Sequence, residues 1–351
     1  MKGDNTIKKQ EMIDFILTHG SPSQKYIVKR DILSVNIKSP EMLELQDQIL
    51  NSKPVKRILK NQNADGWFGI CLHGGIDAMD GAVSQLRALG VEPYHNFMRK
   101  AKKALYADEY PNKARRHYPP VEEYHFSRAL TLACLHIDGE KPDDLLVKFQ
   151  NHLIDKFERG SRVNSLDEVS REIKQARFQA RYPGCRAYLP GKDFPWVSDF
   201  LVLGSSLIWK NEATVQIINA AMQNVARLAP IPVIFHIYNN HYVGSICSYA
   251  AFDYSDDCCE FPKGEIGFWL RDYNFLCKIC DIQKIPYYFR QAEKLAERVK
   301  NNSLIPNLSE AALHAIQTDH GFSGKWKSET QKEVDIYCMV LHILHNAKID
   351  F

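Results

Sequence analysis

Two segments of the chain follow one template, and a repeated template restricts the fold strongly. Residues 62–69 read QNADGWFG and residues 317–324 read QTDHGFSG, so each has a glutamine, a glycine, an aromatic ring and a second glycine in the same order. An aspartate, Asp80 or Asp335, follows each segment, with leucines six and nine positions further on. Such self-similarity indicates that one supersecondary unit is used more than once.

The residues of this template have structural explanations. Glycine permits a tight turn, and an aromatic ring can fill the groove between neighbouring helices. A glutamine amide can bond backbone groups that are left unpaired at a helix end, and a carboxylate is favoured near the start of a helix. We therefore expect structural roles for Gln62, Gly66, Trp67 and Asp80 in the first segment and for Gln317, Gly321, Phe322 and Asp335 in the second.

Helix signals recur along the whole chain. Ser39-Pro40 is typical of a helix start, and Ser328 with Gln331 forms a capping box. Apolar residues recur every three or four positions, as at Val83 and Leu86, and this spacing is helical. The pattern predicts about a dozen helices, no hairpin of strands and an all-α class.

Three segments interrupt the helical pattern and are expected to be long loops. They are residues 107–120, 182–195 and 239–264, which are rich in Pro, Gly, Tyr or acidic residues. No low-complexity linker divides the chain, so a single domain over residues 1–351 is expected.

Bulk composition excludes several classes of protein. Lys plus Arg is 45 against 42 for Asp plus Glu, and the net charge of +3 gives no reason to expect a nucleic-acid partner. No run approaches the roughly 18 apolar residues of a membrane span. The odd count of 9 cysteines and the amphipathic start favour a reducing, cytoplasmic location. The sequence contains no P-loop, hydrolase-elbow or zincin motif, which excludes those three classes. No cofactor is expected.

The two ends of the chain resemble the terpenoid cyclase and protein prenyltransferase superfamily. The resemblance rests on residues 25–33 (KYIVKRDIL), on the run from Val55 to Gly66-Trp67, and on Gln317 with Gly321-Phe322 and the later Asp335 and Tyr337. The order of Gln, Gly and an aromatic matches the QW-type repeat of that superfamily. The resemblance implies an α/α toroid, in which helical hairpins form a closed ring around a central cavity.

The catalytic motifs of the superfamily are matched only in part. Class II cyclases protonate an alkene with an Asp-x-Asp-Asp cluster, and the nearest segment here, residues 253–257 (DYSDD), has one residue more. Asp257 is therefore a candidate acid, with a solvated acidic loop as the alternative. Prenyltransferases hold zinc with an Asp, a Cys two residues later and a distant His, which makes Asp257 and Cys259 candidate ligands.

A second candidate metal set lies near the end of the chain. Spacings of three and four would place Asp335, Cys338 and His342 on one helix face, although core packing explains the same pattern. For the pair Cys277 and Cys280, within an apparent helix, core packing is the preferred interpretation.

The densest polar and aromatic patch spans residues 236–242. His236, Tyr238, His241 and Tyr242 could border a pocket, orient a ligand or exchange protons, with a satisfied polar network as the alternative. Further candidate ligand contacts are Trp269, Asp272 and Tyr337. The basic residues of segment 99–103 suggest either solvated charge or a diphosphate clamp.

Two functions of different classes remain open. One is a toroid that binds a small molecule or a protein partner without the standard catalytic motifs. The other is an enzyme that acts on a hydrophobic, isoprenoid-like substrate, with Asp257, Asp335 or His241 supplying acid catalysis. A glycan-processing toroid is a third possibility, and it would need two opposed carboxylates.

Overall fold

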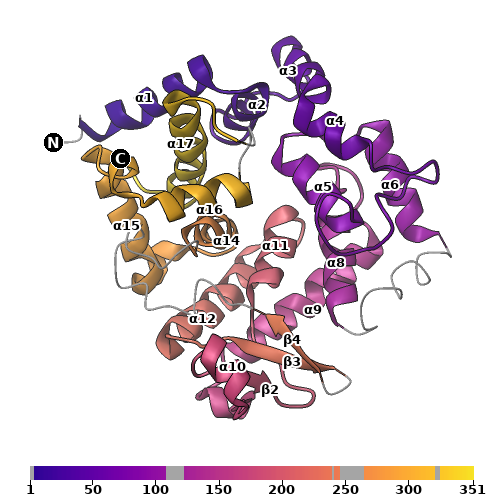
Figure 1. Ribbon diagram of the computed structural model, residues 1–351, viewed down its shortest axis with the longest axis vertical. Helices are drawn as coiled ribbons and strands as arrows, with labels where there is room; N and C mark the ends of the chain where they lie inside the picture. The colour runs from indigo at the N-terminus through magenta and orange to yellow at the C-terminus, as the bar shows by residue number, and fades with distance from the viewer. Residues whose placement is uncertain (1–3, 108–121, 239–240, 246–264, 321–324) are drawn as a thin grey trace. The chain divides into compact units, whose positions relative to one another are not determined.

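The structure is a computed structural model that describes residues 4–107, 122–238, 241–245, 265–320 and 325–351 (Figure 1). Within these residues there are 15 α-helices and one four-stranded sheet, which confirms the prediction of a mainly helical chain. They form two compact units. Unit 1 contains residues 1–149 and 320–342, and unit 2 contains residues 150–319 and 343–351. No helix in the described part of the chain is long and apolar enough to cross a membrane.

Unit 1 is built from helices whose starts follow the sequence signals. Ser21 caps α2 by accepting a hydrogen bond from the backbone of Gln24, and α3 begins at Pro40, where the Ser39-Pro40 signal places it. The helices of unit 1 are α1 (Asp4–His19), α2 (Pro22–Asp31), α3 (Pro40–Asn51), α4 (Lys53–Leu59), α5 (Met79–Ala88), α6 (Asn96–Tyr106) and α8 (Glu122–Cys134). Two helices, α9 (Asp144–Gly160) and α17 (Glu329–Asn346), continue from unit 1 into unit 2.

The first template segment forms a tight turn after α4. Gly66 has φ +92°, and a Cβ at this position would lie 2.5 Å from the carbonyl oxygen of Lys100. The Gln62 amide donates to the carbonyl oxygens of Gly66 and Phe97, at 3.0 and 2.8 Å, and Trp67 is only 1% exposed. The contacts with Phe97 and Lys100 hold the turn against α6. In the second segment Gly321 and Phe322 lie outside the described residues.

The last helix, α17, starts at its capping box and is buried on most sides. The Ser328 hydroxyl accepts from the backbone of Gln331, as the sequence predicts. Asp335, Ile336, Val340 and Leu341 point in different directions around the helix, and all four are fully buried. A helix that is buried on most of its sides contributes to a core.

Unit 2 contains the remaining helices and the sheet. Cys277 and Cys280 lie at the end of α14, and both are buried and free of disulfide, so the core-packing prediction is confirmed. The helices are α10 (Ala176–Arg181), α11 (Val197–Ser205), α12 (Glu212–Leu228), α14 (Glu265–Ile279), α15 (Pro286–Lys300) and α16 (Glu310–His320), with 3-10 turns at η1 (Leu166–Glu168), η3 (Ile282–Lys284) and η4 (Ile305–Asn307).

The sheet corrects the expectation that the chain has no strand hairpin. Its strands are β1 (Ser170–Glu172), β2 (Arg186–Tyr188), β3 (Ile234–Tyr238) and β4 (His241–Ser245), in that order. β3 and β4 form an antiparallel hairpin, β2 runs parallel to β3, and β1 is antiparallel to β2.

Two of the expected loops are therefore wrong in part, because β2 lies within residues 182–195 and β4 within residues 239–264. Strands of three or five residues are too short to show a clear alternation in sequence. They are held by a small core of Ile173, Cys185, Ala187 and Phe235, which forms only when distant segments meet.

Candidate functional site

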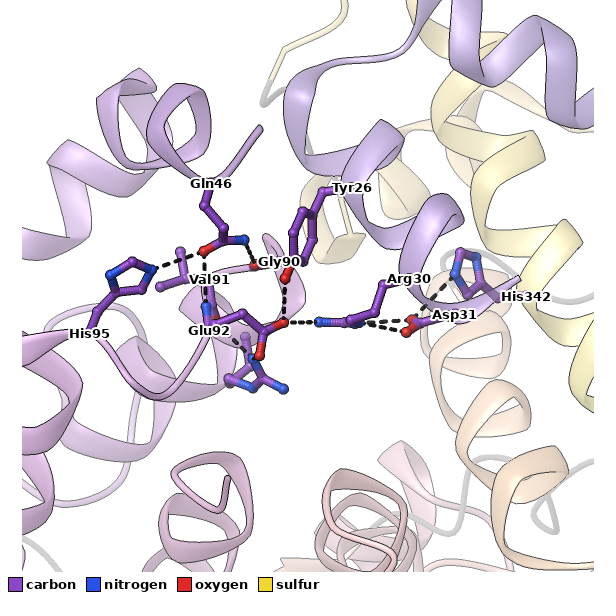
Figure 2. A network of polar contacts seen from close by, with 10 residues as sticks. Tyr26, Arg30, Asp31, Gln46, Gly90, Val91, Glu92, His95 and His342 are labelled. Carbon is purple, nitrogen blue, oxygen red and sulfur yellow. Dashed lines mark hydrogen bonds and ion pairs between the residues drawn. The ribbon is translucent and has the colours of Figure 1, made fainter. Parts of the chain in front are cut away.

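A buried carboxylate in unit 1, Glu92, is the centre of a polar network (Figure 2). Gly90, with φ +85°, ends α5 and turns the chain toward α2. Glu92 then accepts from the Tyr26 hydroxyl at 3.0 Å, from Arg30 at 2.7 Å and from Arg87 at 3.0 Å. Burial alone would raise the pKa of Glu92, but Arg87 and Arg30 outweigh it and hold the pKa below its ordinary value.

The network continues along α2 to α17. Arg30 donates two hydrogen bonds to Asp31, at 2.6 and 3.0 Å, and Asp31 Oδ2 lies 3.6 Å from His342 Nε2 (Figure 2). Burial raises the pKa of Asp31, whereas Arg30 and then His342 lower it, and the result lies well below the ordinary value. The Nδ1 of His342 is 2.6 Å from the carbonyl oxygen of Cys338, which can only accept, so Nδ1 is the donor. The charges of this network are thus paired within the protein.

A neutral arm extends the network to α3. The Gln46 side chain donates to the carbonyl oxygen of Gly90 at 2.6 Å and accepts from the backbone of Glu92 and from His95. Burial lowers the pKa of His95 more than Glu92 raises it. Because Gln46 bonds the backbone of Gly90 and Glu92, this arm connects α3 to the turn that follows α5.

The depressed pKa values of Glu92 and Asp31 predict a loss of stability in acid. A carboxyl group whose pKa is lower in the folded state stabilises the fold above its unfolded pKa, and that stability is lost as the pH falls toward the folded pKa. We expect the free energy of unfolding in urea to decline below about pH 4.5. The Glu92→Gln variant should show a shallower decline, and equal slopes for both proteins would contradict the assignment.

Asp335, a candidate acid and metal ligand in the sequence, has both oxygens bonded in unit 1. Its Oδ1 accepts from the Gln24 amide at 2.6 Å, and its Oδ2 accepts from the indole N–H of Trp326 at 2.7 Å. The candidate ligands Cys338 and His342 follow on the same helix, but His342 Nδ1 is committed to a backbone carbonyl. Among the described residues, no group of three or more His, Cys, Asp or Glu side chains could hold a metal ion. The geometry favours a structural role for Asp335, which bonds Gln24 on α2 and Trp326 to α17.

Asp80 also has a structural role, which it shares with His73. No sequence pattern pointed to His73. Its carboxylate lies 2.6 Å from His73 Nδ1 and accepts from the backbone of Gly74 at 3.1 Å. Asp80 is 2% exposed, in the first turn of α5. The segment that carries His73 is therefore bound over the start of this helix. The only sequence signal for the pair was the helix-start position of the acid.

In unit 2 a lysine and an aspartate form a buried ion pair. Lys156 on α9 lies 3.0 Å from Asp199 on α11, and their side chains are 8% and 4% exposed. The Lys156 ammonium also lies 5.4 Å from the centre of the Trp196 ring, close enough for a cation–π contact. Asp199 accepts in addition from the backbone N–H of Trp196, at the start of α11. Burial raises the pKa of Asp199 despite the lowering effect of Lys156.

His236 on β3, a candidate of segment 236–242, lies next to this pair. Its ring centre lies 4.6 Å from that of Tyr188 and 5.4 Å from that of Trp196. Burial, and then the charge of Lys156, lower the pKa of His236 to about 4, so the imidazole is neutral at pH 7. We call Lys156, Asp199, Trp196, Tyr188 and His236 the lysine cluster.

Tyr242, a second candidate of that segment, lies outside the lysine cluster. Tyr242 pairs with Ile237 in the hairpin and His236 pairs with Val243, so Tyr242 faces the opposite side of the sheet. There it packs on Phe178. The side chains of Tyr238 and His241, and the residues Asp257 and Cys259, lie outside the described part of the chain.

The remaining candidates lie in separate packing environments. Trp269 stacks on Tyr273 with ring centres 4.7 Å apart, and Asp272 accepts from Arg271 at 2.8 Å. In unit 1, Tyr337 contacts the Phe15 ring. Gln317 lies in α16.

Comparison with known proteins adds no relative: no family model, no curated protein and no solved structure matches this chain.

Proposed function

We propose that this chain is a ligand-binding helical protein of the terpenoid cyclase and prenyltransferase type, an α/α toroid without the standard catalytic motifs of that superfamily. Support comes from the template residues of unit 1. Gln62, Gly66 and Trp67 make the contacts that a QW-type repeat would need. The acids Asp80 and Asp335 are bonded by their neighbours, which suits a scaffold better than acid catalysis at these two positions.

The ligand site in this proposal is the lysine cluster, and one observation carries it. The ammonium group of Lys156 is buried and has three N–H donors. Within the residues that the structure describes, Asp199 accepts from one of them and the Trp196 ring contacts the ammonium group, which leaves a donor for a further acceptor. A buried donor without an acceptor is costly, so an oxygen atom from a ligand would be stabilised at the remaining N–H.

The chemistry of the cluster defines the kind of ligand. The Lys156 donor favours a carboxylate or carbonyl oxygen, while the rings of Tyr188 and Trp196 favour a flat, apolar body. His236 is neutral at pH 7 and adds a hydrogen-bonding group without adding charge. The ligand class is therefore a small aromatic or unsaturated carboxylate.

A matched fragment panel tests the site. Aromatic carboxylates and their neutral amides are titrated into protein labelled with 15N in tryptophan, and the indole signal of Trp196 is assigned with the Trp196→Phe variant. We expect carboxylates to shift this signal more than the amides do. The variant Lys156→Met/Asp199→Asn removes both charges at similar volume, so it should fold and lose the preference. Lys148→Gln, at an exposed lysine, is the control. If no panel member moves the Trp196 signal, the proposed site is wrong.

A second candidate function is acid catalysis on an isoprenoid-like substrate, and the raised pKa of Asp199 favours it. Asp199 lies in aromatic surroundings, with Phe200 and Phe157 in ring contact next to it in α11 and α9. Incubation with an isoprenoid diphosphate, followed by mass spectrometry of the organic extract, separates the two functions. Product that disappears in Asp199→Asn would establish the enzyme, whereas carboxylate binding without product supports the first proposal.

A further inference from the structure

Two helices of unit 1 expose positive charge and contain no acidic residue. α4 has the sequence KPVKRIL, and α6 has the sequence NFMRKAKKALY. Seven cations on or next to these helices are exposed: Lys53, Lys56, Arg57, Lys60, Arg99, Lys100 and Lys103. We call them the basic surface. Over the whole chain basic and acidic residues nearly balance, at 45 and 42, so this local excess is a distinct feature.

None of the seven cations forms an ion pair within the part of the chain that the structure describes. Other cations of unit 1 behave differently, since Lys29 pairs with Glu41, and Arg30 and Arg87 pair with Glu92. Charges that stabilise the fold are thus paired in this unit, and those of the basic surface face solvent without internal partners.

The end of α4 lies against the first turns of α6. The Gln62 amide, two residues after Lys60, donates to the carbonyl oxygen of Phe97 at 2.8 Å. The turn at Gly66 approaches the backbone of Lys100 so closely that a side chain at Gly66 would overlap it. The cations at the end of α4 and at the start of α6 are therefore neighbours.

An exposed apolar side chain lies beside this junction. Ile70 is 68% exposed, which is the highest value among the large apolar residues that the structure describes. The preceding Gly69 is bonded to Asn61, directly after Lys60, so Ile70 is held near the end of α4. α6 itself cannot enter a bilayer, because its apolar side, with Met98 and Leu105, is buried in unit 1.

We propose that the basic surface docks on the surface of a bilayer that contains anionic lipids. Groups of four to eight Lys and Arg on an amphipathic helix suit phosphatidylserine or phosphoinositide headgroups, and an adjoining apolar side chain can enter the interface. The modest net charge of +3 argues against a nucleic-acid surface, which is usually far more basic. This inference does not depend on the lysine cluster of unit 2.

Vesicle flotation with the full chain tests the proposal. We expect binding to vesicles of phosphatidylcholine with about 30% phosphatidylserine and no binding to phosphatidylcholine alone, because only the anionic lipid attracts exposed Lys and Arg. Raising the salt from about 50 to about 500 mM should release the protein, because exposed charges are screened. The variant Arg99→Gln/Lys100→Gln/Lys103→Gln should bind about 100-fold more weakly, at about fivefold for each cation. Ile70→Ser should weaken binding by several fold without changing the salt dependence.

The control variant Lys148→Gln/Lys174→Gln/Lys192→Gln removes the same charge from exposed sites elsewhere and should bind like the wild type. Circular dichroism checks that both triple variants are folded. We expect both to fold, because substitutions of exposed side chains usually change stability little. Three results would overturn the proposal: no binding to phosphatidylserine vesicles, equal loss in the control variant, or tight binding to duplex DNA or RNA in place of vesicles.

Discussion

Replacing Glu92 by leucine should lower the free energy of unfolding by about 3 kcal/mol or more. The carboxylate accepts from Tyr26, Arg30 and Arg87 at once, and its side chain is 7% exposed. Leucine would leave the Arg87 guanidinium and the Tyr26 hydroxyl without this acceptor, which costs more than the net contribution of the original bonds. Urea unfolding followed by circular dichroism and fluorescence measures the change.

Glu41→Gln is the matched control for Glu92. Glu41 also pairs with a cation, Lys29, but its side chain is 52% exposed, and exposed pairs contribute no more than about 1 kcal/mol. A similar small loss in both variants would show that the Glu92 network contributes little to the stability of unit 1.

The second large effect is expected for Asp335→Asn, at about 2–4 kcal/mol of lost stability. Both carboxylate oxygens accept hydrogen bonds, from Gln24 and from Trp326. Asparagine has the same shape but turns one acceptor into a donor, so one of these neighbours would face an N–H group. Chemical denaturation measures the loss, with Glu333→Gln, at a half-buried site on the same helix, as the control.

Asp335→Asn also distinguishes a structural role of Asp335 from a role in catalysis or metal binding. An acid catalyst or metal ligand at position 335 would lose activity or metal on substitution by asparagine while stability changed by less than about 1 kcal/mol. A loss of stability in Asp335→Asn that is absent from Glu333→Gln supports the structural role.

The helical class and several helix boundaries could be predicted because their signals are local. Ser39-Pro40 and the Ser328 capping box act within one turn of helix, and the structure places α3 and α17 where these signals do. The sheet could not be predicted in this way. β2 and β3 pair in parallel across a long connection, and each is stabilised by side chains that arrive from elsewhere in the chain.

The residues of the candidate site could also be predicted only where their signal was local in the sequence. His236 was a sequence candidate because it lies in a patch of polar and aromatic residues. Lys156 was not, because an isolated lysine on a helix usually faces solvent, and only packing against Asp199 and Trp196 changes its surroundings. Glu92 was missed for the same reason, since two of its partners lie 62 and 66 positions away.

The bond between Gln24 and Asp335 has a consequence for the synthesis of this protein. The two residues are 311 positions apart. At the pace of a ribosome, roughly 15 to 60 s pass between the emergence of the first helices and the emergence of the helix that they bind. During that time Gln24 on α2 lacks the carboxylate that it bonds, and the apolar ring of Phe15 on α1 lacks the Tyr337 ring that it contacts in the finished fold. Nascent chains of this protein should therefore depend on chaperones that bind exposed apolar segments until α17 has been made.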